Sequence, residues 1–307
     1  MPTLSIPDLD TLANLLGLPK FVLTRFVFHA DRFYKRFCIR KRSGHGYRII
    51  CAPSRELKGI QRWILTFILR AVPLPEVCTA FRKGRSILDN ARPHVDKDFV
   101  YNVDLKDFFP TITLPRVIGL FKALGYPPAV AFALGKLTTY AGKLPQGAPT
   151  SPDLANLICR QLDARLAGLC AKRGWSYTRY SDDLTVSGAG GIDSARRAVA
   201  EIIADEGFQV NPRKVRTVRR KGRQVVTGLV VNRGVNIARH RRKLWRALFR
   251  QADLEPGKFV PRYAELQGYV AFLQMVRPAD TALPVYRAVL AKLQTEAAKQ
   301  STRAQDH

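Results

Sequence analysis

Hydrophobic and polar residues follow two different periods along this chain, and each period predicts its own kind of element. In residues 55–71 apolar side chains recur every three or four positions, which is the spacing of a helix with one buried face. The same spacing predicts helices over residues 8–16, 114–124, 128–140, 152–171, 194–206, 240–251, 261–276 and 283–297. Helices are therefore expected in every third of the chain.

Short runs of β-branched and aromatic residues predict strands between these helices. They cover residues 34–41, 47–51, 99–105, 208–210 and 224–231, and two further runs flank Ser181-Asp182. The sequence Ser43-Gly44-His45-Gly46 is typical of a hairpin turn between the first two strands. This order of elements predicts an α+β fold in which an antiparallel sheet has helices on one face. A mixed N-terminal region precedes the sheet, and a helical region follows it.

The charge of the chain narrows its expected function. The 307 residues include 51 Lys and Arg against 24 Asp and Glu, a net charge of +27, and 46% are hydrophobic, which suffices for a packed core. A globular chain this basic most often binds a polyanion, and nucleic acid is the most common one. Between Arg213 and Arg250 there are fourteen Lys or Arg and no Asp or Glu, whereas a surface that serves only solubility mixes both signs. We therefore expect a protein that binds nucleic acid.

The cysteines and the N-terminal sequence indicate the cellular compartment in which the protein is expected. The five cysteines are odd in number and include no CxxC pair: Cys38, Cys51, Cys78, Cys159 and Cys170. This favours reduced thiols, as in a cytosol, over a disulfide framework or a zinc site. No basic stretch followed by an apolar stretch indicates a signal peptide, and no apolar run reaches the ~18–20 residues of a membrane span. We expect a cytoplasmic protein with no membrane partner.

The candidate chemistry lies in three carboxylates. Asp182 and Asp183 are adjacent in Tyr180-Ser181-Asp182-Asp183, between two strand-like runs, so both are expected at a tight turn. Two like charges repel each other, and a bound divalent cation is the best reason to hold them together. Asp104 lies at the end of the strand predicted at residues 99–105. Three acids on neighbouring strands predict a site for two Mg²⁺ ions that catalyses phosphoryl transfer.

Four segments resemble the sequence motifs of reverse transcriptases, in the order that those enzymes have them. Asn102 to Phe109 resembles motif A, Leu144 to Pro152 motif B, Tyr180 to Asp183 the YADD box with Ser181 in place of Ala, and Gly207 to Lys214 motif D. Two further elements resemble those of the retron type, NAxxH at Asn90 and His94 and VTG at Val226, Thr227 and Gly228. The resemblance covers roughly residues 35–275. The chain thus resembles a retron-type bacterial reverse transcriptase, an RNA-directed DNA polymerase.

The resemblance implies roles for the residues around the acids. Asp104, Asp182 and Asp183 would be catalytic and would hold the metal ions. Six residues would contact the incoming dNTP: Lys41, Arg48, Phe109, Gln146, Gly147 and Lys214. The aromatic ring of Phe109 would exclude a ribose 2′-hydroxyl. Each of these six also has a simpler interpretation, as a solvated charge, a core side chain or part of a helix entrance, and His94 is expected to have no catalytic role.

A basic amphipathic helix near the C-terminal end is the candidate RNA-binding element. Its cations are Arg239, Arg241, Arg242, Lys243, Arg246 and Arg250. Such a helix can also lie on a membrane surface or bind a protein partner. Next to a polymerase site, contact with the phosphates of an A-form duplex is the simpler interpretation.

The resemblance also implies a right-hand polymerase with fingers, palm and thumb. The expected boundaries are residues 1–98 for the N-terminal segment and fingers, 99–235 for the palm with a fingers insertion at about 125–150, and 236–307 for the thumb. Such an enzyme uses dNTPs to copy part of a cognate noncoding RNA into single-stranded DNA (msDNA), primed from an RNA 2′-hydroxyl. A role in antiphage defence, with a separate effector (toxin) protein, is implied as well.

Two alternatives stay open at this point. One is a reverse transcriptase of another lineage, such as a group II intron-like or a diversity-generating type. The other is a catalytically idle RNA-binding scaffold with the same fold. The presence of Asp104, Asp182 and Asp183 argues against the idle scaffold.

Overall fold

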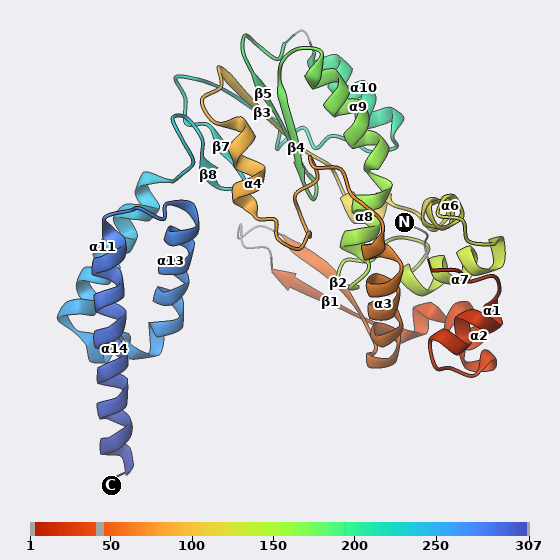
Figure 1. Cartoon of the computed structure of the whole chain (residues 1–307), viewed down its shortest axis with the longest axis horizontal. Coiled ribbons are helices and arrows are strands. Elements are labelled where there is room, and N and C mark those ends of the chain that lie inside the picture. Colours follow the sequence, from red (N-terminus) through yellow and green to blue (C-terminus); the bar gives the residue numbers. More distant parts are fainter. Residues whose placement is uncertain (1–3, 41–45, 194, 306–307) are drawn as a thin grey trace.

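The structure is a computed structural model that describes residues 4–40, 46–193 and 195–305, with the side chains of residues 301–305 left out. Helices and strands alternate through residue 237, and helices alone follow (Figure 1). The α-helices are α1 (Leu9–Leu15), α2 (Lys20–Phe28), α3 (Arg55–Phe67), α4 (Ile87–Ala91), α5 (Phe108–Thr111), α6 (Leu114–Ala123), α7 (Pro128–Thr138), α8 (Ser151–Ile158), α9 (Arg160–Ala171), α10 (Arg196–Asp205), α11 (Arg239–Leu254), α12 (Pro256–Phe259), α13 (Tyr263–Val276) and α14 (Ala282–Gln305).

The remaining regular elements are short 3₁₀ helices and strands. The 3₁₀ helices are η1 (Ala30–Phe33), η2 (Leu69–Ala71), η3 (Arg92–His94) and η4 (Val260–Arg262). The strands are β1 (Tyr34–Arg40), β2 (Tyr47–Pro53), β3 (Phe99–Asp104), β4 (Ser176–Tyr180), β5 (Asp183–Gly188), β6 (Arg216–Arg219), β7 (Val225–Val226), β8 (Leu229–Val230) and β9 (Asn236–Ile237). This mixture confirms the α+β fold.

Local sequence signals set the first helix boundaries. α1 begins after Asp8, whose carboxylate accepts a hydrogen bond from the backbone N–H of Thr11 at 2.7 Å. α3 begins after Ser54, whose hydroxyl accepts from the backbone N–H of Leu57 at 3.3 Å. A proline precedes each capping residue and keeps the chain before it extended. Both helix starts therefore follow from the sequence alone.

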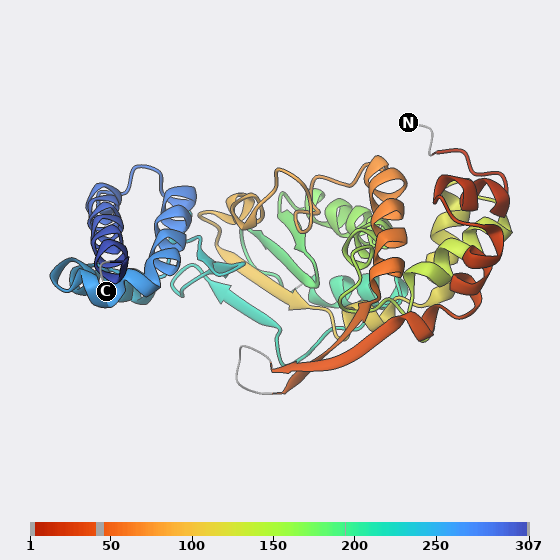
Figure 2. The same ribbon diagram turned by 90° about the horizontal axis from the view of Figure 1, so that it is seen from below.

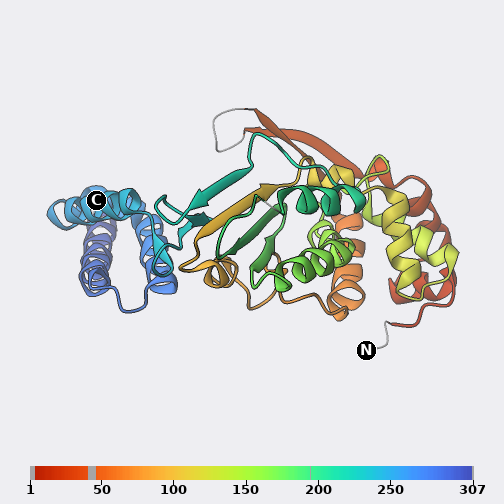
Figure 3. The ribbon, with the colours of Figure 1, turned by 90° about the horizontal axis from the view of Figure 1, so that it is seen from above.

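A four-stranded antiparallel sheet, in the order β4-β5-β3-β6, forms the middle of the molecule (Figure 3). One of its faces packs on α9 and α10 through a shared apolar core. The opposite face also carries helices, because α4 and η3 lie against β4 and β5. This corrects the expectation of helices on one face only. These two elements are held there because the His94 ring of η3 and the backbone carbonyl of Asn90 in α4 form hydrogen bonds with hydroxyls on that face.

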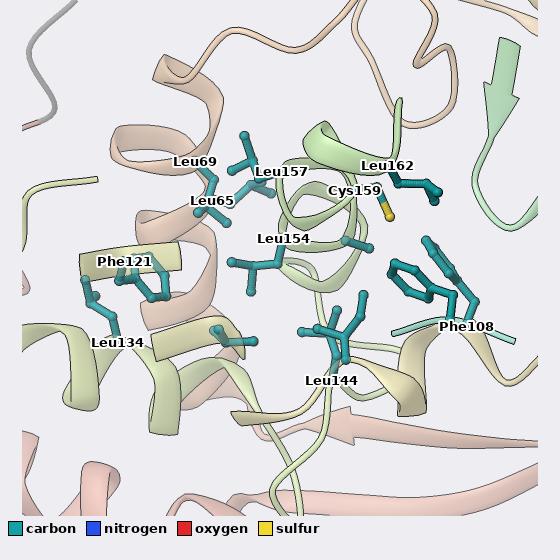
Figure 4. Close-up of a cluster of buried hydrophobic side chains, with 14 of the residues drawn as sticks. Leu65, Leu69, Phe108, Phe121, Leu134, Leu144, Leu154, Leu157, Cys159 and Leu162 are labelled. Atoms are coloured by element: carbon teal, nitrogen blue, oxygen red, sulfur yellow. The ribbon is translucent and has the colours of Figure 1, made fainter. Parts of the chain in front are cut away.

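The larger hydrophobic core joins this sheet to the N-terminal helices. In Figure 4, Leu65 and Leu69 lie beside Leu154 and Leu157 of α8, and all four are buried. Phe108, which directly follows the strand of Asp104, belongs to the same core. Each buried side chain of this size contributes about 1.5–3 kcal/mol relative to an exposed one. The end of the sheet that carries the candidate acids is therefore anchored in the main core.

A second core holds the C-terminal helices together. At its centre the rings of Phe249 and Tyr286 stack with centroids 3.9 Å apart, and Trp245 stacks on Tyr269 at 4.9 Å. Val100 of β3 belongs to this core as well, which ties the helical unit to the sheet. Figure 2 shows this unit, α11 to α14, at the end of the molecule opposite to α1 and α2.

The structure divides two elements that the sequence pattern predicts as continuous. The helix expected at 152–171 is α8 followed by α9, because the backbone of Cys159 leaves helical geometry at φ −78° and ψ 1°. The strand expected at 224–231 is the hairpin β7–β8, because Thr227 and Gly228 both have left-handed φ values, 45° and 82°. Of the strand expected at 208–210, Val210 alone is paired, in an isolated bridge to Leu105.

The other predicted elements are either confirmed by the structure or lie outside the described residues. β1 pairs with β2 as expected, and residues 43–45 of the expected hairpin turn lie outside the described residues. The helix α2 and the edge strand β6 were not expected from the sequence pattern. Among the described residues, no single helix is long and apolar enough to cross a membrane. α1 and α2 reach that length only together, and they are bent by 103° at the break between them.

Candidate active site

The three candidate acids meet where β3 and β4 end and β5 begins. β4 and β5 are joined by the two-residue loop Ser181-Asp182, because Tyr180 is the register partner of Asp183. Asp183 is also the register partner of Asp104 on β3, and the backbone N–H of Leu105 donates to the Asp182 carbonyl at 2.9 Å. The acids of two segments far apart in the sequence therefore share one end of the sheet.

Asp104 is held by two side chains from the segment before β6. Lys214 Nζ lies 2.6 Å from Asp104 Oδ2, and Asn211 Nδ2 donates to Asp104 Oδ1 at 3.0 Å. The backbone N–H of Asn211 donates to the Asp104 carbonyl at 2.8 Å, which fixes this segment beside β3. The Asp104 side chain is 6% exposed, whereas that of Lys214 is 59% exposed. The cation can therefore exchange this contact for another anion without any rearrangement of the core.

The three acids lie close enough together to shift the pKa values of Asp182 and Asp183. Partial burial and the neighbouring charges of Asp182 and Asp104 raise the pKa of Asp183 to about 6. Burial and the charge of Asp104 also raise the pKa of Asp182. Partial burial lowers the pKa of Lys214, but its bond to Asp104 outweighs this and leaves the pKa raised overall. The site holds more negative charge than Lys214 neutralises, which is the condition that favours a bound cation.

The donor atoms at this site fit magnesium. Mg²⁺ prefers oxygen ligands and keeps waters or substrate phosphates in its shell, so one or two carboxylates from the protein are enough. Within the described ranges no group of three or more His, Cys, Asp or Glu side chains is already assembled as a metal cage. Asp104 is turned toward Lys214 and Asn211 instead. A cation would offset the repulsion that raises the pKa of Asp182 and Asp183.

Sequence reasoning missed the residue directly behind the turn. The side chain of Arg179 is fully buried and forms an ion pair with the fully buried Asp163, with Nη2 and Oδ2 2.7 Å apart. Its Nη1 donates to the carbonyl of Ser181 at 3.2 Å. The available signal was the alternation of strand β4, in which Arg179 shares the core-facing side with Tyr177.

Phe108 and Phe109 have different environments. They begin the short helix α5 after Asp107, which has a left-handed φ of 46°. Phe108 is 4% exposed and its ring packs on Phe208 at a centroid distance of 5.7 Å. Phe109 is half-buried. Phe108 is therefore a core residue, and part of Phe109 stays accessible.

The loop of Gln146 and Gly147 lies against β2. The backbone N–H of Cys51 donates to the Gln146 carbonyl at 2.8 Å. Gly147 has a φ of 125°, and a Cβ there would come within 2.9 Å of Ile50 Cγ2 and 3.0 Å of the Cys51 carbonyl oxygen. The absence of a side chain at Gly147 is therefore required for the approach of β2.

Of the two expected phosphate-binding cations, Arg48 belongs to the β1–β2 hairpin, which projects from the body as an arm (Figure 2). Arg48 is exposed on β2, opposite Ile39 on β1. Lys41 lies outside the described residues. Because β2 is bonded to the loop of Gln146, Arg48 stands on the strand that adjoins this loop.

The NAxxH element is buried under the β4–β5 hairpin. Asn90 and His94 are both 0% exposed. The ring nitrogens of His94 lie 2.6 Å from the Ser187 hydroxyl and 2.8 Å from the Thr178 hydroxyl, and so connect β5 with β4. Burial lowers the pKa of His94 to about 3, so the ring is neutral at physiological pH. His94 therefore braces the hairpin and takes no part in proton transfer.

The VTG element contacts the NAxxH element. Val226 is buried, and the turn that follows it consists of Thr227 and Gly228. The Thr227 hydroxyl donates to the Ile87 carbonyl at 3.2 Å, at the start of α4. Asn90 lies in the same five-residue helix. The two elements, far apart in the sequence, therefore form one structural unit.

The basic helix α11 turns one face to the second core and the other outward. Five of the six candidate RNA-binding cations are exposed: Arg239, Arg241, Lys243, Arg246 and Arg250. Arg242 is half-buried, and its Nη2 lies 2.8 Å from Oδ2 of the buried Asp280. Arg242 thus has a structural partner inside the helical unit. Arg241 lies over the rings of Trp245 and Phe272, at 5.7 Å from each centroid, and the other four cations extend into solvent.

Comparisons with known proteins agree with this geometry. Residues 39–241 match the family of reverse transcriptases (RNA-dependent DNA polymerases). The chain is 39% identical to the retron Mx65 reverse transcriptase of Myxococcus xanthus over 88% of this chain and 68% of that protein. It is 41% identical to the retron Ec86 reverse transcriptase of Escherichia coli over 80% of this chain and 78% of that one. The chain therefore belongs to the retron reverse transcriptases, which are RNA-dependent DNA polymerases.

Proposed function

We propose that this protein copies part of a cognate structured noncoding RNA into single-stranded DNA, and that a 2′-hydroxyl of that RNA primes the reaction. The observation that carries the proposal is the meeting of Asp104, Asp182 and Asp183 at one end of the sheet. In this proposal residues 1–98 are the N-terminal segment and the fingers, 99–235 the palm with a fingers insertion at about 125–150, and 236–307 the thumb. The order of motifs along the chain supports these boundaries.

The three carboxylates are the proposed ligands of two Mg²⁺ ions. Bound there, the ions would activate the attacking hydroxyl and stabilise the charge of the departing pyrophosphate. Asp104 and Asp183, as register partners, would present their oxygens from adjacent strands. Reverse transcriptases as a family use a divalent metal ion, and the excess negative charge at this site supports its binding here.

The surrounding residues would bind and orient the dNTP. Lys214 stays protonated at neutral pH, since its pKa is raised, and would give a proton to the pyrophosphate as it leaves. The accessible part of Phe109 would exclude a 2′-hydroxyl on the sugar. Gln146 and Gly147 would line the nucleotide from the side of β2, and Arg48 and Lys41 would hold its triphosphate.

Primer extension on an RNA template with Mg²⁺ tests the assignment of the acids. The double variant Asp182→Asn plus Asp183→Asn should lose incorporation by on the order of 10³-fold or more, because several kcal/mol of charge stabilisation disappear. Its RNA affinity should stay that of the wild type. Equal incorporation by both proteins would refute the site. A wild type that binds RNA tightly but incorporates nothing would instead favour the idle scaffold.

The nucleic acid that co-purifies with the protein tests the priming step. Sequencing of its RNA and DNA should give one RNA species joined to its copy through a 2′,5′ linkage. Copies without any branch would favour a different lineage of reverse transcriptase. We extend the proposal to antiphage defence with a separate effector protein, and deletion of the chain from a phage-resistant host should then remove the resistance.

The exposed cations of α11 are the proposed grip on the RNA. Each phosphate contact releases a counterion, so the logarithm of the affinity should fall with the logarithm of the salt concentration by roughly 0.7–0.9 per contact. Replacement of Arg239, Arg246 and Arg250 by Gln should flatten this slope. Binding that hardly changes between about 50 and 200 mM salt would contradict the proposal.

A further inference from the structure

The guanidinium of Arg179 has more partners than a salt bridge requires. It has five N–H donors, and all five are used. Nε and Nη2 donate to the two carboxylate oxygens of Asp163 at 2.8 and 2.7 Å. The remaining donors reach Asn156 Oδ1 at 3.0 Å, the Ser181 carbonyl at 3.2 Å and Cys78 Sγ at 3.3 Å. A buried charge is tolerated only when it is paired and bonded in this complete way.

The backbone of Arg179 is fixed as firmly as its side chain. Its N–H donates to the Val77 carbonyl at 2.8 Å, and its carbonyl accepts from the N–H of Thr79 at 3.0 Å. The hydroxyl of Thr79 donates to the same carbonyl at 3.1 Å. Asp163 is fixed in turn, since the Tyr177 hydroxyl donates to its Oδ1 at 2.9 Å. The guanidinium therefore has very little freedom to move relative to the sheet.

The one partner of Arg179 that lies in the catalytic loop is the Ser181 carbonyl. Ser181 has a φ of 62°, a conformation that costs a non-glycine residue about 1–2 kcal/mol. Its carbonyl belongs to the peptide unit that leads into Asp182, so the orientation of this unit decides where the Asp182 side chain points. The next peptide is held from the opposite side, where Leu105 N–H donates to the Asp182 carbonyl at 2.9 Å. The two peptide units on either side of the Asp182 Cα are thus each fixed by one hydrogen bond, from Arg179 and from the N–H of Leu105.

We propose that Arg179, locked by Asp163, is a positioning residue that holds the Ser181–Asp182 peptide in the orientation in which Asp182 and Asp183 bind divalent metal. This inference rests on the proposed polymerase function and assigns the reason for a buried charge behind its site. Arg179 itself touches neither metal nor nucleotide. The simpler role of the pair is to stabilise the fold, and the two roles predict different results when the whole pair is replaced.

The decisive variant is Arg179→Met combined with Asp163→Leu. Replacing both partners of a buried ion pair by apolar residues of similar volume leaves stability nearly unchanged or higher in many proteins. The double variant should therefore fold, with a thermal midpoint somewhat below that of the wild type because the Tyr177 hydroxyl and the Asn156 amide lose buried partners. Its affinity for Mn²⁺, measured by electron paramagnetic resonance on the full chain without nucleic acid, should fall by about 10- to 100-fold. The kcat of primer extension should fall with it, and the KM for dNTP should change less.

Two further variants make the result unambiguous. Arg165→Met removes an arginine of α9, the helix of Asp163. Arg165 pairs with Asp205 at 2.7 Å and Glu206 at 2.9 Å, and its loss should leave Mn²⁺ affinity unchanged. Arg179→Lys keeps the charge beside Asp163, but a single ammonium cannot serve Asp163, Asn156 and Ser181 together. It should fold and show an intermediate loss of Mn²⁺ affinity, which keeps the test valid if the double variant does not fold.

Wild-type Mn²⁺ affinity in a folded Arg179→Met plus Asp163→Leu or Arg179→Lys variant would overturn the inference. The Mn²⁺ measurement also separates it from the proposed function. If the wild type binds Mn²⁺ through Asp182 and Asp183 but extends no primer, the polymerase proposal fails and the positioning role of Arg179 is still decided by metal affinity alone.

Discussion

Two aspartate–cation pairs each have one member in the central sheet, and they have almost the same length but different surroundings. Lys214 is 2.6 Å from Asp104, and Arg179 is 2.7 Å from Asp163. The Lys214 side chain is 59% exposed, whereas both side chains of the second pair are 0% exposed. The first pair involves a flexible ammonium at the surface, and the second a planar guanidinium that is bonded on every side.

The difference in burial decides which of the two ion pairs can exchange its partner and which one cannot. An exposed ion pair contributes about 0–1 kcal/mol, so Lys214 can leave Asp104 for a phosphate at little loss. A buried pair resists the loss of either member, since the remaining charge would have no partner. One end of the sheet therefore combines an exchangeable pair in front of the Ser181-Asp182 loop with a permanent pair behind it.

The largest effect is expected when one member of the buried Arg179–Asp163 pair is removed and the other is left. Asp163→Ala leaves the guanidinium of Arg179 buried with no opposite charge, which should lower the free energy of unfolding by about 3–5 kcal/mol. Urea unfolding followed by tryptophan fluorescence measures this change. The surface variant Arg165→Met should change it by less than about 1 kcal/mol. A similar small change for Asp163→Ala would show that water reaches the pair, and the contrast in burial would no longer hold.

Removal of the exchangeable cation should affect the reaction more than the fold. Lys214→Gln should lower the rate of dNTP incorporation by on the order of 100-fold, because the proposed proton donor for pyrophosphate is lost. Its free energy of unfolding should change by less than about 1 kcal/mol. Single-turnover incorporation and urea unfolding on the same preparation give both numbers. A stability loss as large as that of Asp163→Ala would make the two pairs equivalent.

A smaller effect is expected in the loop between the two pairs. Ser181→Gly removes the strain of a non-glycine residue at φ 62° but adds freedom to the unfolded chain. The two contributions oppose each other, so stability should rise by about 1 kcal/mol or less. Incorporation should stay within about threefold of the wild type if Arg179 and Leu105, and not the identity of residue 181, fix the loop. A loss as large as that of Lys214→Gln would assign the orientation of the loop to Ser181 itself.

The smallest effect is a pH dependence at the front of the loop. The pKa of Asp183 is raised from 3.8 to about 6, so the folded protein holds a proton that the unfolded chain releases. In a chelating buffer the contribution of Asp183 to stability is present below pH 3.8 and is lost as pH rises through about 6. The thermal midpoint of the wild type should therefore fall relative to Asp183→Asn over this range. Asp153, whose pKa is also raised to about 6, contributes equally to both proteins and cancels. Parallel curves would show that Asp183 is not perturbed.

Most of the front of the site follows from local sequence signals. The alternation around Tyr180 to Asp183 predicts the hairpin, and the position of Asp104 at a strand end predicts its meeting with the acids. Contacts between distant residues do not follow from such signals. The resemblance to motif D identifies Lys214, but no local pattern predicts its bond to Asp104, 110 residues away, or the pair of Arg179 with Asp163 on another element. An arginine in a short strand is normally exposed to solvent. The burial of Arg179 depends on Asp163, which no sequence periodicity connects to it.

Turns in β-branched sequence were missed for a different reason. Val225 to Val230 has the composition of one continuous strand, and threonine rarely adopts a left-handed φ. The structure nevertheless bends at Thr227, whose φ is 45° and whose hydroxyl bonds to α4. A tertiary contact here overrides the local preference. The break at Cys159 between α8 and α9 has no comparable signal in the sequence.

The bond between Thr227 and Ile87 limits how this enzyme can be recombined with its relatives. The two residues are 140 positions apart, yet they form one joint between the sheet and the helical unit. A chimaera that imports the C-terminal third of another reverse transcriptase with a crossover between them would combine a turn from one parent with a helix from the other. Exchanges of the C-terminal third should therefore transfer residues 86–94 together with the segment that begins at residue 224.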